Sequence, residues 1–379
     1  MRVLGIETSC DETSAAIVEE RTDAAGPWTV CSNIVASQVA IHQAWGGIVP
    51  ELSARQHIRD ICGVVERAVE DAGPVPAGRA PYDLIAVTQG PGLVGSLLVG
   101  LSFAKSLAWS RNVPFVPVHH LAGHIESLVL ESGEMPLPAV VLVVSGGHTS
   151  LYRVPSRGVY ERLGRTRDDA AGEAYDKVAK LLGLGYPGGP LIDRLAAEGN
   201  DRAVPLPKTR LTHRDRNAPD VPGHRDFSFS GLKTSVARYV TLRRAALGLP
   251  EDAPLPESDI RDLCASFQRV VVATLLDAVF DAAGDTGARS VGIAGGVSAN
   301  SRLRRDALAR GEAAGLPVLV PALSLSTDNA AMIAAAGLRA FHAGARGDWA
   351  VNADASLPLG RDGAARRERG PRAASGKPA

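Results

Sequence analysis

Apolar and polar positions follow one another along this chain in blocks that predict the same order of elements twice. "VLGIETSCDETSAAIVEE" and "VVLVVSGGHTSLYRV" each hold an apolar run, a polar turn and a second apolar run, which is typical of a β-hairpin. A strand, a glycine-rich turn and a helix come later in each half, in "DLIAVTQGPGLVGSLLVGLSFAKSLA" and "SVGIAGGVSANSRLRRDALARG". Another strand then leads into a helix, in "VPFVPVHHLAGHIES" and "LPVLVPALSLSTDNAAMIAAAG". This order predicts an internal duplication rather than two unrelated α/β domains.

A duplicated unit of this kind predicts an α/β fold with two lobes, each a mixed sheet flanked by helices. We expect lobes over residues 1–133 and 134–341, with the helix near 330–345 packing back on the first lobe. Residues 187–226 are polar and proline-rich, which predicts an insertion or long loop. Residues 360–379 lack apolar periodicity and are expected to be disordered; their arginines are either solvated or in contact with RNA. Because ligands of open α/β sheets bind beyond the carboxyl ends of the strands, the turns of both lobes should face a shared cleft.

Composition narrows the classes of function. The 379 residues are 45% hydrophobic and carry 41 basic and 41 acidic side chains, so no overall field draws the protein to nucleic acid or anionic membrane. No apolar run approaches the roughly 18 residues of a membrane helix, and "MRVLGIETS" does not resemble a signal peptide. The cysteines form no CxxC motif, which excludes a disulfide framework and a thiolate zinc site and favours a cytoplasmic setting; they are Cys10, Cys31, Cys62 and Cys264.

A histidine cluster, "HHLAGH", begins the helix expected after "VPFVPV". His120 and His124 are four residues apart and share a helix face, whereas His119 does not share it. The equivalent junction of the second half, "STDNAAM", carries Asp328. Surface histidines and an N-capping aspartate are the ordinary interpretation. Because the positions match in the duplicate, we favour a site of two histidines and one carboxylate with open positions for substrate; a zinc-protease HExxH motif is absent.

Two glycine-rich turns suit a nucleotide. "SGGHT" offers backbone N–H groups that can hold a phosphate, or is simply a tight hairpin turn. "GGVSAN" precedes a helix whose N-terminus attracts anions, and Asn300 either bonds the nucleoside or caps that helix. Asp176 and Asp193 lie on predicted helices where they either grip ribose hydroxyls or are solvated. Walker A and Rossmann glycine motifs are absent, so these features describe a nucleotide between two lobes with a metal beside it.

Ten motifs in order resemble the universal tRNA threonylcarbamoyltransferase family, called TsaD or Gcp in bacteria. They are "GIETSCDETS", "GGIVPELSARQH", "GPGLVGSLLVG", "HHLAGH", "VSGGHT", "GEAYDK", "YPGGPLID", "FSFSGLKT", "GGVSAN" and "STDNAAM". The resemblance runs from about Met1 to Phe341. It departs from the family at Ala330, where glycine is usual, in a longer polar insertion at 210–226, and in the tail.

The resemblance implies an actin-like fold of the sugar kinase and Hsp70 type (ASKHA). It also implies transfer of a threonylcarbamoyl group from threonylcarbamoyl-AMP to N6 of adenosine 37, next to the anticodon, in tRNAs that read ANN codons, with release of AMP. One divalent metal per subunit, usually Fe²⁺ with Zn²⁺ or Mg²⁺ as alternatives, is held in the family by residues matching His120, His124 and Asp328. Adenylate contacts map onto Val143, Val144, Ser145, Gly146, Gly147, Asp176, Gly189, Asp193 and Asn300. A truncated actin-like paralogue and a small P-loop ATPase are the expected protein partners, and no membrane is involved.

The chemistry of this reaction suggests further roles. An exocyclic adenine amine is a poor nucleophile, so Asp11 or Glu12, at the tip of the first hairpin, would orient it or accept its proton. Five basic residues are either in contact with anticodon-loop phosphates or ordinary surface charges: Arg165, Arg167, Lys177, Lys180 and Lys233. The alternatives are an actin-like kinase, a small-molecule carbamoyltransferase, and a non-catalytic scaffold paralogue, which would be expected to lack the HxxxH pair and the distant aspartate.

Overall fold

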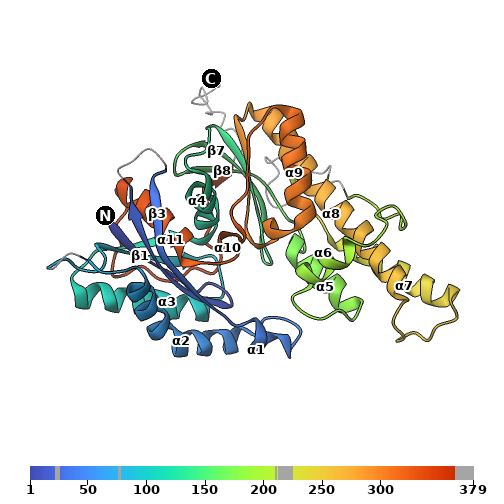
Figure 1. Cartoon of the computed structure of the whole chain (residues 1–379), viewed down its shortest axis with the longest axis horizontal. Helices are drawn as coiled ribbons and strands as arrows, with labels where there is room; N and C mark the ends of the chain where they lie inside the picture. Colours follow the sequence, from blue (N-terminus) through green and yellow to red (C-terminus); the bar gives the residue numbers. More distant parts are fainter. Residues whose placement is uncertain (22–25, 76–77, 210, 212–224, 363–379) are drawn as a thin grey trace, which may run out of the picture.

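Two mixed β-sheets form the framework of the protein (Figure 1). The structure, a computed structural model, describes residues 1–21, 26–75, 78–209, 211 and 225–362. The first sheet has the strand order β3-β2-β1-β4-β5 and the second the order β10-β9-β6-β7-β8-β11. The strands of the first sheet are β1 (Arg2–Glu7), β2 (Glu12–Glu20), β3 (Trp28–Ser37), β4 (Leu84–Gly90) and β5 (Phe115–His119). Those of the second are β6 (Ala139–Val144), β7 (Thr149–Ser156), β8 (Val159–Arg165), β9 (Ser290–Ala294), β10 (Val318–Leu319) and β11 (Arg361–Asp362).

The two sheets repeat one topology. In the first, β1 pairs antiparallel with β2 and β2 with β3, while β1, β4 and β5 run parallel. In the second, β6, β7 and β8 form the same antiparallel hairpins, and β6, β9 and β10 run parallel. Strand β11 adds a parallel edge next to β8. The duplication predicted from the order of apolar segments is therefore confirmed, as is the actin-like fold that the family resemblance implies.

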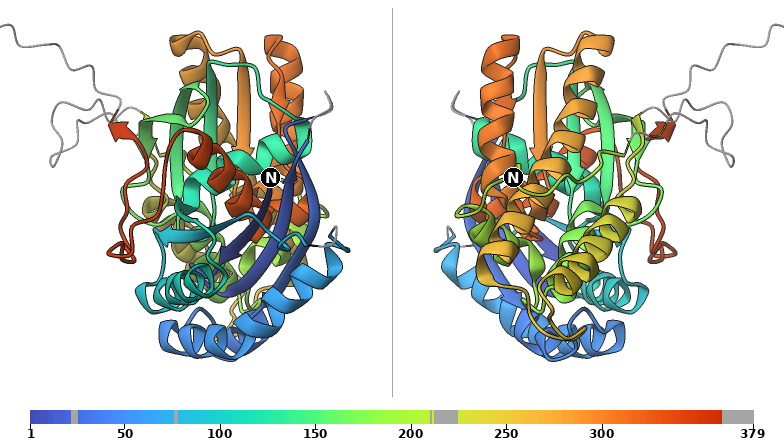
Figure 2. Two further views of the ribbon diagram at one scale, coloured as in Figure 1. Left: turned by 90° about the vertical axis from the view of Figure 1, so that its left-hand side faces the viewer. Right: turned by 90° about the vertical axis from the view of Figure 1, so that its right-hand side faces the viewer.

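Helices form three layers around these sheets (Figure 2). One layer, with α2 and α3, covers the outer face of the first sheet, and another, with α5 to α9, covers the second. The outer helices are α1 (Val39–Gln43), α2 (Pro50–Asp71), α3 (Val94–Arg111), α5 (Ala171–Leu181), α6 (Gly188–Ala196), α7 (Ser230–Ala246), α8 (Glu257–Thr286) and α9 (Ser301–Ala314). The remaining helices are α4 (His120–Ser132), the 3-10 turn η2 (Gly296–Ala299), α10 (Leu323–Ser326) and α11 (Ala330–His342).

Helices α4 and α11 form the middle layer, which the two sheets share. Their side chains join one apolar core with residues of both sheets, and α11 packs on β1, β2, β4 and β5 although it follows the second sheet in sequence. Helix α11 carries mostly small residues over much of its length, "AAMIAAAG", which lets backbones approach closely. At Gly123 of α4 an added Cβ would lie 2.8 Å from Cδ1 of Ile333, so α11 packs closely against this glycine.

The proline-rich range 187–226 is only partly a loop. It begins with helix α6, and coil and turns follow as far as residue 209. Helix α6 is the helix predicted to carry Asp193, and its apolar face packs on α8, so only the later part of the range is a loop. Residues 212–224 and the part of the expected disordered tail beyond 362 lie outside the described residues, whereas Arg361–Asp362 at the start of that tail form β11. Within the described part of the chain, only α8 is long and apolar enough to cross a membrane, and 67% of its apolar window is buried inside the protein.

Candidate metal and nucleotide site

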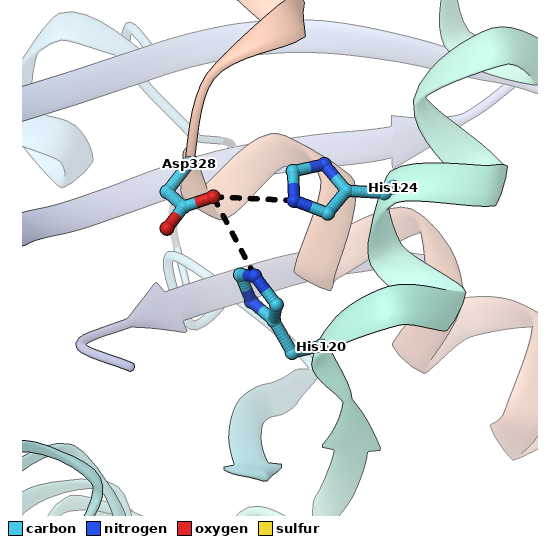
Figure 3. A group of neighbouring side chains, drawn as sticks. All are labelled: His120, His124 and Asp328. Atoms are coloured by element: carbon cyan, nitrogen blue, oxygen red, sulfur yellow. Dashed lines mark ion pairs between the residues drawn. The ribbon is translucent and has the colours of Figure 1, made fainter. Parts of the chain in front are cut away.

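The two histidines and the aspartate predicted as metal ligands lie together (Figure 3). His120 and His124 project from the first two turns of α4, and Asp328 lies in the turn before α11. Oδ1 of Asp328 is 3.2 Å from Nε2 of His124 and 3.5 Å from Nε2 of His120. One nitrogen or oxygen atom from each residue lies within 4.8 Å of the others. These spacings suit three ligands on one face of a single cation.

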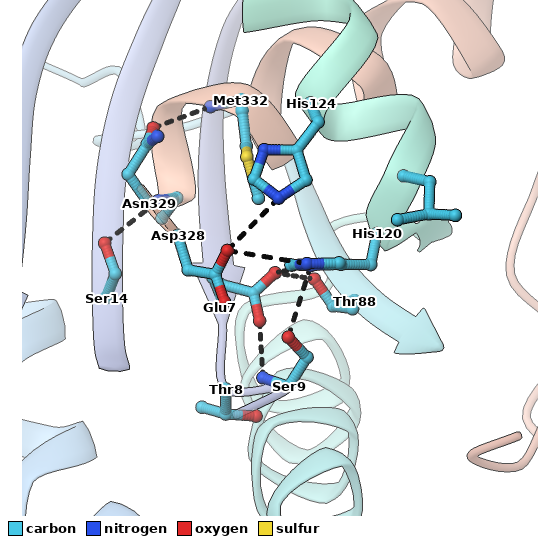
Figure 4. Close-up of polar contacts among 12 residues, drawn as sticks. Glu7, Thr8, Ser9, Ser14, Thr88, His120, His124, Asp328, Asn329 and Met332 are labelled. Carbon is cyan, nitrogen blue, oxygen red and sulfur yellow. Dashed lines mark hydrogen bonds and ion pairs between the residues drawn. The ribbon is translucent and has the colours of Figure 1, made fainter. Parts of the chain in front are cut away.

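Capping at the two helix starts explains which residues face the site. His119 is the N-cap of α4: its Nδ1 accepts a hydrogen bond from the Leu121 N–H (3.1 Å), and its Nε2 donates to the Leu357 carbonyl (2.9 Å). At α11 the N-cap is Asn329, whose side chain accepts from the Met332 N–H (3.1 Å). Asp328 is therefore not the cap, and its carboxylate is directed at the histidines (Figure 4).

The electrostatics of the three residues favour a bound cation. Burial alone would lower the pKa of His120, but the carboxylates of Asp328 and Glu7 outweigh burial and raise it to about 9. Burial lowers the pKa of His124, which is fully inaccessible and whose ring nitrogens make no well-oriented hydrogen bond among the described residues. Buried polar atoms without partners are rare and call for a ligand. Two imidazoles and a carboxylate form the donor set of non-haem Fe(II) sites, so these residues fit a divalent metal.

Glu7 and His148 also belong to this site, and the sequence-based prediction missed both. Glu7 ends β1, is fully buried and accepts a hydrogen bond from Nδ1 of His120 (3.0 Å). His148 belongs to the "SGGHT" turn, and its ring centroid is 6.5 Å from that of His120. Burial and the neighbouring charge of His120 lower the pKa of His148 to about 4. An acid at the end of an otherwise apolar central strand was a usable signal for Glu7, whereas His148 had no signal beyond its place in a turn.

The tip of the first hairpin brings more carboxylates to the same place. Asp11 is 7% exposed, and Glu12 begins β2. Burial, together with the charges of Asp328 and Asp11, raises the pKa of Glu12 well above its usual range. Asp11 also raises the pKa of Asp176, which belongs to the second half of the chain. The acids of the N-terminal tip therefore lie within electrostatic reach of both the metal ligands and the predicted nucleotide residues.

The predicted phosphate turns meet at the end of β6. Val143 and Val144 end that strand, and Ser145 to Gly147 form the turn to β7, closed by a hydrogen bond from the Ser145 N–H to the His148 carbonyl (2.7 Å). A Cβ on Gly146 or Gly147 would meet nothing within 4 Å, so there is open space above both. The start of α5 lies directly below, since a Cβ on Gly172 would be 2.6 Å from the Ser145 carbonyl oxygen. The turn therefore adjoins the N-terminus of a helix, a favourable place for an anion.

The predicted nucleoside residues form a second group, on α5, α6 and α9. Asp176 accepts a hydrogen bond from the Gly188 N–H (2.7 Å) at the start of α6, next to Gly189, above which there is open space. Asn300 caps α9 by accepting from the Leu303 N–H (2.9 Å), and its amide also donates to Asp193 (3.1 Å). Both roles left open for Asn300 are thus compatible, because its oxygen caps the helix while its NH₂ faces Asp193.

Gln268 of α8 joins this group and was not predicted from the sequence. Its side-chain amide donates to Asp193 (2.9 Å) and accepts from Asn300 (2.9 Å). Ser301 donates to the same carboxylate through both its backbone N–H (3.0 Å) and its hydroxyl (2.8 Å). Asp193, Gln268 and Ser301 line a cavity of about 320 Å³ together with Arg302. Its polar lining suits a hydroxylated or heteroaromatic group.

Gly295 connects the two glycine-rich turns and provides a test of their packing. Its backbone angles, φ 92° and ψ 165°, are accessible almost only to glycine, and an added Cβ would lie 2.5 Å from the Val144 carbonyl oxygen. We expect Gly295→Ala to lower the free energy of unfolding by about 1–3 kcal/mol, measured by urea denaturation. Gly296→Ala is the matched control, since its Cβ would meet nothing within 4 Å; equal midpoints for the two variants would contradict the packing argument.

Three of the basic residues expected to contact RNA pair with acids, the first being Arg167, which pairs with Asp226. Lys177 pairs with Asp169 (2.6 Å), and Lys233 pairs with the same carboxylate (3.3 Å). Hydrogen bonds that Lys177 donates to Asp169 and Glu173 raise its pKa to about 12. Lys233, whose role the sequence left open, thus ties α7 to the segment before α5. Contacts of Arg165, Arg167, Lys177, Lys180 and Lys233 with tRNA stay a prediction.

Known proteins similar to this chain share one description. The model of the TsaD family, described as tRNA N6-adenosine threonylcarbamoyltransferase, matches residues 29–335. A protein of that name from Thermodesulfovibrio yellowstonii is 49% identical over 359 residues, covering 95% of this chain and 100% of the relative. One from Koribacter versatilis is 46% identical over 385 residues, covering 94% and 98%.

A more distant likeness concerns the fold alone. The solved structure of T. kodakarensis HypF covers 90% of this chain and 48% of its own, at 13% identity and a TM-score of 0.54. The fold, the histidine–aspartate cluster and the family match along most of the chain lead to one assignment. The chain belongs to the TsaD family of tRNA N6-adenosine threonylcarbamoyltransferases.

Proposed function

We propose that this protein transfers a threonylcarbamoyl group from threonylcarbamoyl-AMP to N6 of adenosine 37 in tRNAs that read ANN codons, and releases AMP. The observation that carries the proposal is the approach of His120 and His124 to Asp328, across the middle layer of the fold. Burying two imidazoles and a carboxylate in mutual contact costs desolvation free energy. A scaffold without catalysis would not be expected to keep such a cluster.

The transfer forms one bond and breaks one. The exocyclic N6 attacks the carbamoyl carbon, the bond between that carbon and the phosphate oxygen of AMP breaks, and AMP leaves with the electron pair. The amine loses one proton, which Glu12 or Asp11 would accept. The adenine amine is weakly nucleophilic because its lone pair is delocalised into the ring, so the mixed anhydride supplies the driving force.

Different residues would bind the threonylcarbamoyl, phosphate and adenosine parts of the adenylate. A divalent metal held by His120, His124 and Asp328, which we propose to be Fe²⁺, supplies Lewis-acid polarisation when bound. The backbone N–H groups of Gly146 and Gly147 hold the phosphate and stabilise charge on the departing AMP. The group formed by Asp176, Gly189, Asp193 and Asn300 holds the adenosine.

Other components of the reaction are also proposals. The protein acts in the cytoplasm on tRNA, and the adenylate comes from a separate synthase. A truncated actin-like paralogue and a small P-loop ATPase act as its partners, as the family resemblance implies. Neither partner is needed to explain the ligand cluster, which this chain forms alone.

The decisive experiment combines purified protein, Fe²⁺, threonine, bicarbonate, ATP, an adenylate synthase, the partner proteins and unmodified tRNA. Nucleoside mass analysis should then detect threonylcarbamoyladenosine, absent when this protein is omitted. Phosphorylated product instead would indicate an actin-like kinase, a carbamoylated small molecule would indicate the other enzymatic alternative, and no product with a fully folded, metal-loaded protein would indicate a scaffold.

A further inference from the structure

We propose that Glu7 is a positioning residue of the metal site, which fixes the tautomer and orientation of His120 so that Nε2 is available to the metal. This inference rests on the proposed metal-dependent function. Glu7 is not one of the three proposed ligands, because it contacts Nδ1 of the imidazole, whereas Asp328 lies nearest to Nε2. It acts through His120 (Figure 4).

Three neighbouring parallel strands bring the necessary groups together. Glu7 ends β1, Thr88 lies near the end of β4, and His120 follows the end of β5. Since the carboxyl ends of parallel strands meet at one edge of a sheet, these side chains converge there. All three are buried, with 0% of Glu7, 0% of Thr88 and 4% of His120 exposed. No solvent is available to reorient them.

The hydrogen bonds define which atoms donate. The Thr88 hydroxyl donates to Oε2 of Glu7 (2.6 Å), and the Ser9 N–H donates to Oε1. Both carboxylate oxygens of Glu7 thus act as hydrogen-bond acceptors. Nδ1 of His120 lies 3.0 Å from Oε2 and must also donate. The proton of the neutral imidazole is therefore on Nδ1, and the lone pair of Nε2 points toward Asp328.

This arrangement has a defined chemical consequence. A metal-binding histidine normally donates its second N–H to a carboxylate or carbonyl, which fixes the ring and makes the ligating nitrogen more basic. Loss of such a partner typically weakens metal binding about 10–100-fold. His124 has no comparable partner at its Nδ1 among the described residues. Glu7 therefore acts on one of the two imidazoles, and its effect should be specific to that ring.

The test measures metal binding, not turnover. Glu7→Gln is expected to weaken Zn²⁺ binding, measured by chelator competition, about 10–100-fold, and Glu7→Asp to give an intermediate loss. In Zn²⁺-loaded protein labelled with ¹⁵N-histidine, the wild type should show His120 protonated at Nδ1 and metallated at Nε2. Glu7→Gln should lose or shift that Nδ1–H signal while the His124 signals change little.

Two further variants keep the test decisive. Glu126→Gln is the matched control, since Glu126 lies on α4 two residues after His124, is 3% exposed and contacts Arg339 and Tyr160; its metal affinity should equal that of the wild type. If Glu7→Gln fails to fold, Thr88→Val removes the hydroxyl that aligns Glu7 and should weaken binding by a smaller factor. Wild-type affinity in folded Glu7→Gln would overturn the inference, whereas absence of metal binding by the wild type would overturn the proposed function itself.

Discussion

Replacing Asp328 with asparagine is expected to abolish both metal retention and threonylcarbamoyl transfer. Asparagine has almost the same shape, so the turn before α11 and the cap at Asn329 are preserved. The carboxylate charge, however, is the only negative ligand that the cluster of His120, His124 and Asp328 offers. Loss of a residue that only hydrogen-bonds to a metal ligand lowers metal affinity about 10–100-fold. Loss of the Asp328 carboxylate itself should lower metal affinity more than about 100-fold, measured by metal analysis after gel filtration.

The stability of the metal-free variant separates this effect from misfolding. Burial lowers the pKa of His120, but the charges of Asp328 and Glu7 outweigh burial and raise it. Asp328→Asn therefore also removes a favourable interaction with His120, and we expect a modest fall in melting temperature. Asp281→Asn, at an exposed position on α8, is the control and should keep its metal and its activity. An Asp328→Asn protein that retains stoichiometric metal would show that the cluster is not the metal site.

Much of the fold followed from the sequence because duplication is visible in patterns of apolar residues. Each half contains the same series of hairpin, strand, turn and helix, and those local signals were strong enough to predict two similar mixed sheets. The helix near 330–345 was expected to pack on the first lobe, but the apolar faces of α4 and α11 do not reveal that both sheets share these two helices. Only the packing shows that both sheets close on the same pair of helices.

The site was predictable where its residues are close in sequence or in matching positions of the two halves. His120 and His124 were related by helix periodicity, and Asp328 by its place in the duplicate. Gln268 could not be predicted, since it lies in the middle of a long apolar helix and meets Asp193 and Asn300 only in three dimensions. Sequence patterns predict which face of an element is buried, but not which polar group on a distant element completes a network.

The second large effect concerns Glu12, whose environment suits a general base. Burial and the charges of Asp328 and Asp11 raise its pKa well above that of a free glutamate. A carboxylate with a raised pKa is closer to the pH at which the reaction runs, and removal of such a base typically slows a reaction about 10²–10⁴-fold. We therefore expect Glu12→Gln to slow transfer by that factor and to lose the rise in rate with pH that ionisation of Glu12 produces. Undiminished rates in both Glu12→Gln and Asp11→Asn, with metal and adenylate still bound, would contradict the assignment.

The same raised pKa predicts the sign of a stability effect in metal-free protein. Because the folded state holds the Glu12 proton more tightly than the unfolded chain, this group stabilises the fold below the unfolded pKa of about 4.5. That contribution is lost as the pH rises through the higher folded-state pKa, where a buried charge forms beside Asp328 and Asp11. Glutamine carries no such charge, so the melting temperature of Glu12→Gln in EDTA should match the wild type near pH 4.5 and exceed it increasingly toward neutral pH. A constant difference across that range would show that Glu12 is not held in its protonated form. If the expected pH dependence is found, the gain in stability and the loss of rate in Glu12→Gln have one cause: the wild type holds a carboxylate among other acids, at the position where the reaction needs it.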